Sequence, residues 1–550
     1  MSNLNYKQIS MPIVAAIAVV FGLYLGKYLY TEKGINKYNI DFTSNSSTHK
    51  IQRILDAVDN YYVDSINYNQ IEEEVIASVL KQLDPHSVYI PAAKMQIEND
   101  RMEGVFGGIG VQFKIVKDTI VLLKIIKNGP AEKVGLNAGD KIIRVNDSLF
   151  AGNNLSIEKI IGTLRGEKGS KVNVGVLRQS DSLFFEITRG MLPIYSVDYA
   201  EILDHSVGYI KINRFSKTTM KEFKKATKNW NEDSLNGLIV DLRGNPGGLL
   251  EEVIELCDAF LPEGKMIVYT KDKYQTEERI STDEGKFHAV PLTVLIDEGS
   301  ASASEIFAGS MQDNDRAVII GRRSFGKGLV QRPFDLKDGS VLRLTIARYY
   351  TPVGRCIQRD YGENKSDYYN EISNRLSGGE LSNKDSMVVT DSLKYITPMG
   401  NVVYGGGGII PDLFVPIDSI KTDEKSNELL ILIYQNALSE LFAISQMNQL
   451  SKRSFGSMDS AYAKLTELAI TEKYYEFLKL RLNLDTDFKN IPTPLKQKLE
   501  DQIITDILGY LFDEAGTYYS FLLKDRAVNS AKNHFLKVDQ KTDTNLNIQP

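Results

Sequence analysis

The chain has 550 residues, of which 42% are hydrophobic and 25% charged, and its formal net charge at pH 7 is −6. A globular chain of this length has room for several cores, so we expect several domains. The mild negative charge and the lack of a long basic block exclude a nucleic acid bound through its phosphates.

Metal and disulfide chemistry have little support in the sequence. The only cysteines, Cys257 and Cys356, are too few for a disulfide framework and lack the spacing of zinc ligands. The zinc-protease pattern HExxH is also absent. We therefore expect no metal ion and no cofactor, and the redox compartment stays undetermined.

An uncharged apolar segment, Gln8–Gly26, lies close to the start of the chain. As a helix it would extend about 28 Å, close to the thickness of the hydrocarbon core of a bilayer. Because no convincing cleavage site precedes Lys27, an uncleaved membrane anchor is favoured over a signal peptide or a core helix. The flanking lysines do not set its orientation, and the polar run Thr43–His49 is typical of a tether.

Apolar residues recur at helical spacing over Ile51–Leu83, which predicts two short amphipathic helices. The tripeptide Asp84-Pro85-His86 ends the second helix.

Residues 101–190 change to short β-rich runs with two short helices, Ala131–Val134 and Ile157–Leu164. The glycines before the first run can turn backbone N–H groups toward one carboxylate. An open strand beside them would accept a peptide as an added strand. The expected strands are Gly110–Ile115, Thr119–Ile126, Lys141–Val145, Lys171–Leu177 and Leu183–Ile187.

The run Gly129–Asp147 (GPAEKVGLNAGDKIIRVND) resembles the PDZ-domain signature in spacing and composition. The resemblance implies that residues 101–190 bind peptide C-termini. Its carboxylate loop would consist of Phe106, Gly107, Gly108, Ile109 and Gly110.

Strands and helices alternate from Ser196 onward, which predicts an α/β core with a sheet buried between helices. The expected strands are Val207–Ile212, Gly237–Asp241, Met266–Thr270, Leu292–Ile296, Ala317–Ile320 and Val341–Tyr349. The expected helices are Thr218–Trp230, Leu249–Phe260 and Ala301–Gln312.

Two strand-to-helix junctions are candidates for chemistry, since active sites of such cores gather there. Asp241–Gly248 (DLRGNPGG) and Gly299–Phe307 (GSASASEIF) can both aim N–H groups at a developing oxyanion. Ser302 and Glu305 also stand in capping-box spacing, so a helix cap explains the serine without chemistry. The residues alone leave Ser300, Ser302 and Ser304 as alternatives for a nucleophile.

A lysine between two glycines, in Ser324–Gln331 (SFGKGLVQ), follows an apolar strand. If Lys327 is buried, desolvation lowers its pKa and lets the neutral amine act as a base. Gln331, four residues on, can lie on the same side and hold the amine. A surface lysine on a glycine turn is the alternative.

Together these segments resemble carboxy-terminal processing peptidases, also called tail-specific proteases. DLRGNPGG, GSASASEIFAGSMQDN, SFGKGLVQ, ARYYTPVGRCIQ and GGIIPD occur in the order seen in that family, and LDPHSVYI and LRGEKGS fit it too. The resemblance implies Ser302 as nucleophile, Lys327 as base and Gln331 as its holder. It also implies oxyanion donors at Ala303 and at Gly248, with Gly247 as the other candidate, and Arg165 as a regulatory contact of the PDZ region.

The resemblance implies a multidomain α/β protein with a crotonase-like α/β protease core and an inserted PDZ-like β-rich module. An N-terminal transmembrane helix and a helical C-terminal domain complete it. The expected parts are a short tail (1–8), an anchor (9–31), a linker (32–49), a helical region (50–100), the PDZ-like domain (101–190), the protease core (191–420), the helical domain (421–540) and a disordered tail (541–550).

The expected function is that of a membrane-anchored serine endopeptidase that recognises substrate C-termini and cleaves peptide bonds through an acyl-enzyme. Its partners would be proteins or peptides with accessible C-termini and the membrane; a homodimer or an adaptor stays open. The expected location is the bacterial cytoplasmic membrane, with the catalytic part in the periplasm or outside the cell. A non-catalytic, membrane-tethered PDZ scaffold is the alternative, and a triad that uses His288 is a weaker one.

Overall fold

The computed structural model describes residues 49–282, 284–362, 365–418, 424–447, 449–450, 455–467, 470–483 and 491–546. The expected anchor, Gln8–Gly26, lies outside these ranges. Within them, no single helix is long and apolar enough to cross a membrane. Helices α11 (Glu424–Gln435) and α12 (Leu438–Gln446), bent by 58°, meet that criterion only as a pair, by length and composition.

The chain divides into two compact units, residues 1–75 and 76–550. The described part of the first unit holds α2 (His49–Tyr61) and the start of α3 (Tyr68–Leu80), which confirms the two helices expected there. In the second unit, β1 (Val88–Ile90) and α4 (Ala92–Glu103) follow the Asp-Pro-His turn.

A six-stranded sheet forms the centre of the second unit, and its inner strands were correctly predicted. Its order is β10 (Val197–Leu203), β11 (Val207–Ile212), β12 (Gly237–Asp241), β15 (Leu292–Ile296), β16 (Ala317–Gly321) and β21 (Leu413–Phe414). From β11 to β21 neighbouring strands are parallel, and β10 pairs antiparallel with β11. Every residue of β12 and β15 is buried, which is why these strands are continuous apolar runs.

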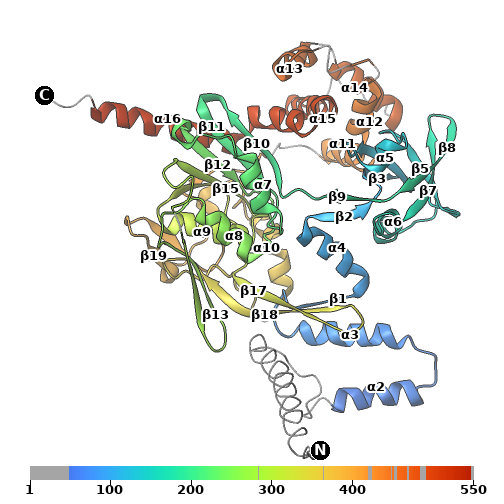
Figure 1. Ribbon diagram of the computed structural model, residues 1–550, viewed down its shortest axis with the longest axis horizontal. Helices are drawn as coiled ribbons and strands as arrows, with labels where there is room; N and C mark the ends of the chain where they lie inside the picture. Colours follow the sequence, from blue (N-terminus) through green and yellow to red (C-terminus); the bar gives the residue numbers. More distant parts are fainter. Residues whose placement is uncertain are drawn as a thin grey trace, which may run out of the picture. The chain divides into compact units, whose positions relative to one another are not determined.

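Helices cover both faces of this sheet. On one face lie α7 (Thr219–Ala226), α8 (Leu250–Asp258) and α9 (Ala303–Asp313), grouped together in Figure 1. On the other, the end of α15 (Thr493–Lys524) and α16 (Arg526–Leu546) pack against Val207, Tyr209 and Ile239. Burial of each large aliphatic side chain stabilises the fold by about 1.5–3 kcal/mol relative to exposure.

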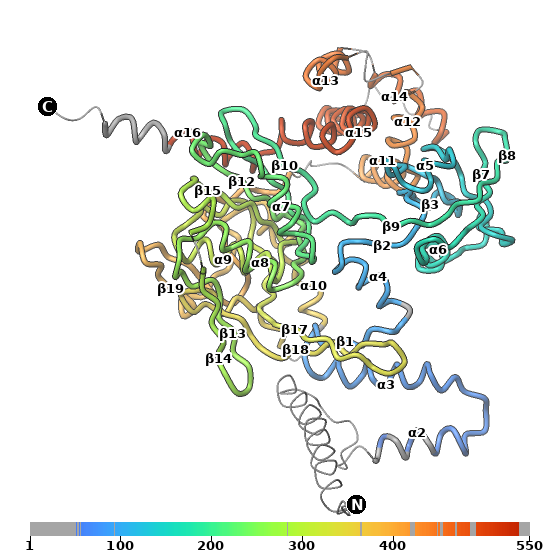
Figure 2. The backbone as a smooth tube through the Cα atoms, viewed as in Figure 1, coloured from blue at the N-terminus to red at the C-terminus, as the bar shows by residue number. Residues whose placement is uncertain are grey.

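A second sheet joins segments that are far apart in the sequence. β18 (Val341–Tyr350) pairs with β1, with β13 (Met266–Lys271) and with β17 (Leu329–Asp335), and β14 (Thr276–Ile280) completes the sheet. The β13–β14 hairpin extends from the core in Figure 2. This sheet brings the Asp-Pro-His turn before β1 close to Lys327, which lies just before Gly328 and β17.

One α-helix and two short strands lie between β18 and β21. They are α10 (Lys365–Ser377), β19 (Lys394–Ile396) and β20 (Val402–Tyr404), and the last two pair as a hairpin.

The PDZ region has its own sheet and its own core. The strands run in the order β3 (Val111–Val116), β4 (Thr119–Ile125), β5 (Lys141–Val145), β7 (Lys171–Arg178) and β8 (Asp181–Thr188), and β6 (Ser148–Leu149) pairs with β5. Helices α5 (Pro130–Lys133) and α6 (Ile157–Leu164) complete it. The chain enters through β2 (Val105–Gly108) and leaves through β9 (Gly190–Pro193), which pair with each other. β3 therefore lies at the edge of the sheet.

The C-terminal region is helical, as expected. Helices α11 and α12 are separated at Ala437, which has a positive φ of 50°. Helices α13 (Met458–Glu467) and α14 (Ile470–Leu482) follow. Helix α16 begins within the expected helical domain (421–540) and continues through Leu546, into the tail expected to be disordered from Lys541.

Candidate active site

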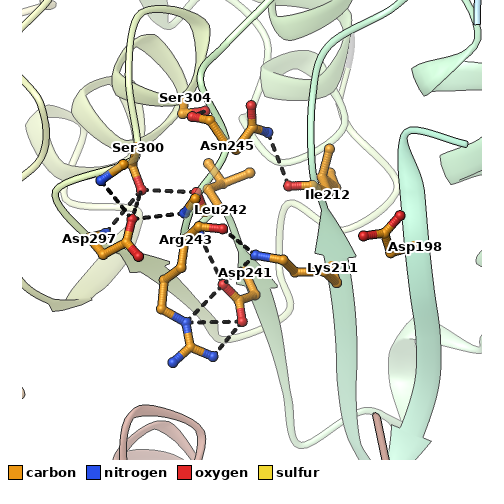
Figure 3. Close-up of polar contacts among 12 residues, drawn as sticks. Asp198, Lys211, Ile212, Asp241, Leu242, Arg243, Asn245, Asp297, Ser300 and Ser304 are labelled. Carbon is orange, nitrogen blue, oxygen red and sulfur yellow. Dashed lines mark hydrogen bonds and ion pairs between the residues drawn. The ribbon is translucent and has the colours of Figure 1, made fainter. Parts of the chain in front are cut away.

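The two glycine- and serine-rich junctions meet at one edge of the central sheet. β12 and β15 are parallel neighbours, with Asp241 opposite Leu295, so the loops that follow them lie side by side. The Ala301 N–H donates to the Asn245 carbonyl oxygen over 3.0 Å. Figure 3 shows the hydroxyl contacts of Ser300 and the position of Ser304 beside Asn245.

The three serines of Gly299–Phe307 differ in their surroundings. Ser300 Oγ donates to the Leu242 carbonyl oxygen over 2.9 Å, and Ser304 Oγ donates to that of Asn245 over 2.9 Å. Both serines are fully buried, and they join the two loops. Ser302 is only partly buried, so it is the one of the three with a hydroxyl open to a substrate.

The backbone at Ser302 is strained, with φ 56° and ψ −113°. Such a conformation costs about 1–3 kcal/mol in a non-glycine residue and persists only where the surroundings enforce it. It places Ser302 directly before the first turn of α9, whose positive dipole end favours negative charge.

Backbone donors surround Ser302. The Gly247 N–H already donates to Asn245 Oδ1 over 2.9 Å. The N–H groups of Gly248 and of Ala303, the first residue of α9, have no acceptor among the described residues. A side chain at Gly247 would place Cβ 2.9 Å from Ala303 N, and one at Gly248 would place it 1.9 Å from the Phe215 carbonyl oxygen. Glycine at both positions lets this loop approach the serine.

The amine of Lys327 is held by the predicted glutamine. Lys327 Nζ donates to Gln331 Oε1 over 2.8 Å. The Gln331 amide nitrogen donates to the carbonyl oxygen of His86, which orients the amide so that its oxygen faces the lysine. No hydrogen bond joins Lys327 Nζ to Ser302 Oγ within the described part of the chain, so the structure shows the amine resting on Gln331.

Burial lowers the pKa of Lys327 to about 8, and the positive charge of Arg343 adds to this effect. Burial likewise lowers the pKa of His86 to about 4, helped by the charge of Lys327. At neutral pH His86 is therefore uncharged, and in part of the molecules the Lys327 amine is neutral.

Two residues tie the backbones of Ser302 and Lys327 together. The Glu305 carboxylate accepts from the Ser302 N–H over 2.7 Å and from the Lys327 N–H over 2.9 Å, both at Oε2. Its Oε1 accepts from Ser324 Oγ and from the Gly326 N–H over 2.5 and 2.6 Å. The Tyr349 hydroxyl lies 3.1 Å from the Ser302 carbonyl oxygen and 2.5 Å from that of Lys327.

These two residues, and the turn before β1, carry site roles that sequence reasoning did not assign. Glu305 was interpreted only as a helix cap, whereas it also fixes the lysine turn. The Asp84 carboxylate accepts from the N–H groups of His86 and Ser87 and from Thr345 Oγ1 of β18, which fixes the turn that orients Gln331. Asp84 lies in LDPHSVYI and Tyr349 in ARYYTPVGRCIQ, two segments that resemble the protease family. The resemblance indicated these two positions but not their contacts.

The other predicted site residues lie elsewhere. Arg165 Nη1 is 2.8 Å from Asp100 Oδ2 of α4, and its guanidinium stacks on the Phe106 ring at 4.5 Å. The first three residues of the expected carboxylate loop pair with β9, so only Ile109 and Gly110 connect β2 to β3. His288 precedes β15, at the opposite end of that strand from Ser302, and its Nδ1 is 2.8 Å from the Gly285 carbonyl oxygen.

Comparison with known proteins gives two family matches. Residues 206–365 match peptidase family S41, and residues 107–188 match the PDZ domain.

The chain is 32% identical to the carboxy-terminal processing protease CtpB of Bacillus subtilis (strain 168) over 368 residues, which cover 64% of this chain and 75% of the relative. It is 31% identical to a probable CtpA-like serine protease of Staphylococcus aureus (strain MRSA252), covering 63% and 68%. Among solved structures it is similar to a photosystem II D1 C-terminal processing protease, with 23% identity, a TM-score of 0.34 and coverage of 69% and 96%.

Proposed function

Since this chain belongs to the carboxy-terminal processing proteases of peptidase family S41, a family of serine peptidases, we propose that it cleaves peptide bonds with a dyad of Ser302 and Lys327. We further propose that its PDZ domain captures the C-terminus of the substrate and that an N-terminal helix anchors it in a membrane.

One observation carries the dyad. Of the three serines at the start of α9, Ser302 alone is open, and the same Glu305 oxygen binds the N–H groups of Ser302 and of Lys327. The two residues are thus neighbours, and the lysine is desolvated enough to be a base near neutral pH.

The mechanism begins when the neutral Lys327 amine turns from Gln331 to Ser302 as the substrate enters. Hydrogen bonds of this kind are often long or absent without substrate. Lys327 accepts the hydroxyl proton while Ser302 Oγ attacks the scissile carbonyl carbon. The oxyanion that forms accepts hydrogen bonds from the N–H groups of Gly248 and Ala303.

Collapse of the tetrahedral intermediate breaks the C–N bond, and protonated Lys327 donates its proton to the leaving amine. A water molecule, deprotonated by Lys327, then attacks the acyl-enzyme; the ester bond to Ser302 Oγ breaks, Lys327 returns the proton to Oγ, and the second product leaves. A serine–lysine arrangement of this kind needs no acidic third member. Gln331 accepts the lysine's hydrogen bond between the steps.

The edge strand β3 supports the proposed role of the PDZ domain. A peptide can extend the sheet beside β3, with its carboxylate at the connection formed by Ile109 and Gly110. The apolar, uncharged segment Gln8–Gly26 supports the anchor. With that anchor, the catalytic part works at the cytoplasmic membrane of a bacterium, on its periplasmic or outer side.

Variants of the dyad test the proposal. We expect Ser302→Ala and Lys327→Ala to fold normally and to lose at least about 10³-fold in kcat on a casein substrate. A serine-reactive probe should form one covalent adduct, located at Ser302 by mass spectrometry. The exposed residues Ser148 and Lys337 provide matched controls, since Ser148→Ala and Lys337→Ala should keep full activity. Near-full turnover by Lys327→Ala would show that another group is the base.

A further inference from the structure

Arg243, in the loop that leads to the oxyanion donors, is held on two sides. Its Nε and Nη2 lie 3.0 and 2.6 Å from the Asp241 carboxylate, and Figure 3 shows this pair together with Lys211. Its Nη1 lies 2.8 Å from Oδ2 of Asp525, which is 282 positions away in the sequence. The Lys211 amine also donates to the Arg243 carbonyl oxygen. Both the side chain and the backbone of Arg243 are therefore fixed.

Asp525 is the residue between α15 and α16, and its two oxygens have separate partners. Oδ1 accepts from the Val528 N–H over 2.8 Å, which caps α16, while Oδ2 accepts from Arg243. The side chain is only 9% exposed. The Arg243 guanidinium is planar, has a carboxylate on each side and is largely shielded from solvent. Such a pair holds the position of the side chain more firmly than an exposed ion pair does.

The same loop continues into the catalytic groups. Arg243 is followed by Gly244–Gly248, and this stretch bonds to the serine loop through Asn245 and through Asp297, which accepts from the Gly244 N–H over 2.8 Å. We therefore expect a shift of Arg243 to be transmitted along this stretch toward the Gly248 N–H. Donors aimed at an oxyanion lose much of their effect when they move by a fraction of an ångström.

We propose that Asp525 is a positioning residue for the oxyanion loop, Arg243–Gly248. Through Asp525, the C-terminal helical region then contributes to catalysis. The inference rests on the proposed function. Asp525 lies outside the ranges that match the peptidase and PDZ families, residues 206–365 and 107–188. The contact with Arg243 thus comes from a part of the chain that lies outside both family matches.

Asp525→Asn is the decisive variant. Asparagine is as good a helix N-cap as aspartate, so the α16 cap is kept with the amide oxygen toward Val528. The amide nitrogen then faces the Arg243 guanidinium, and the attraction is lost. We expect kcat to fall about tenfold with KM unchanged within about twofold, because the loss concerns the transition state. The matched control is Asp501→Asn, which removes an exposed pair with Lys524 on the same helix α15 and should leave kcat unchanged.

Two further measurements separate positioning from a general loss of structure. Amide hydrogen exchange of residues 242–250 should become faster in Asp525→Asn, with the rest of the central sheet and the melting temperature close to wild type. In the Arg243→Gln background, Asp525→Asn should have no further effect on kcat.

The proposal is overturned by wild-type exchange of residues 242–250, by an unchanged kcat, or by effects of the two substitutions that simply add. If the wild-type protein cleaves no peptide, the proposed function fails, while the exchange measurement still decides whether Asp525 holds the loop.

Discussion

At the scale of single residues, the proposed chemistry depends on the protonation of Lys327. Its pKa is lowered to about 8 by burial, with a further contribution from the charge of Arg343, while Glu305 and Asp84 act in the opposite direction. In the proposed mechanism, the neutral amine is the form that accepts the Ser302 proton. About one tenth of the lysine is neutral at pH 7 and about half at pH 8, since each pH unit changes the ratio of the two forms tenfold. Catalysis therefore gains as the pH rises.

The first prediction concerns this pH dependence. For the wild-type protein, kcat should rise with pH, with a midpoint near 8, and level off above it. Arg343→Gln removes a positive charge that favours the neutral amine, so the pKa of Lys327 rises and the midpoint moves to higher pH by about half a unit. Lys337→Gln, at the exposed turn between β17 and β18, is the control and should leave the midpoint in place. A midpoint that stays fixed or moves to lower pH in Arg343→Gln would contradict the assigned base.

At the scale of elements, the first turn of α9 and the turn before β17 behave as one unit. Glu305 is fully buried, and burial raises its pKa. Four donors oppose that effect, because each hydrogen bond favours the charged carboxylate. The carboxylate thus does more than cap a helix: it joins the backbones of Ser302 and Lys327, the proposed nucleophile and base.

The second prediction tests this link with Glu305→Gln. The amide has only one acceptor oxygen, so its nitrogen faces two of the four donors, and a buried network is left unsatisfied. We expect the free energy of unfolding to fall by about 2–4 kcal/mol and kcat to fall with it. Denaturant unfolding and steady-state kinetics measure both. Glu251→Gln, at an exposed position of α8, should change neither; a Glu305→Gln variant with wild-type stability would show that the four bonds are not a network.

At the scale of the whole molecule, the C-terminal helices contact both the protease core and the PDZ domain. The Tyr510 hydroxyl of α15 donates to the Leu123 carbonyl oxygen of β4 over 2.7 Å. Further along α15, Asp513 and Glu514 pair with Lys127 and Lys124 at 2.5 and 2.6 Å. One helix therefore touches β4 of the PDZ domain and, just beyond its end, the oxyanion loop.

The third prediction concerns capture of the substrate by the PDZ domain. A peptide substrate with a free C-terminus should be cleaved with a lower KM than the same peptide amidated at its C-terminus, because only the free carboxylate can bind the N–H groups beside β3. The kcat values should be similar, since the reacting bond is unchanged. A free peptide added in trans should compete only when its own carboxylate is free. Equal KM values for the two substrates would reject carboxylate capture.

Much of the fold and the segments of the candidate site could be predicted from the sequence. The buried strands β12 and β15 are apolar runs bounded by turn residues, and a run of that kind has few other stable environments. Ser302, Lys327 and Gln331 were identified from segments that resemble a protease family, and the structure brings the lysine and the glutamine into contact. The edge strand β10 and the helix α10 were missed, because their mixed polarity resembles that of loops.

Only the tertiary structure could distinguish among residues of the same type. The hydroxyls of Ser300 and Ser304 donate to a loop about 60 residues earlier, which excludes these two serines as candidate nucleophiles. Gly247 differs from Gly248 as a candidate oxyanion donor because its N–H is already bound to Asn245. The contact between Asp525 and Arg243 spans 282 positions. Local patterns reflect the environment of a segment, buried or exposed, which its own composition determines. Which partner each polar group finds depends on how distant segments pack, and that is decided only when the sheets and helices assemble.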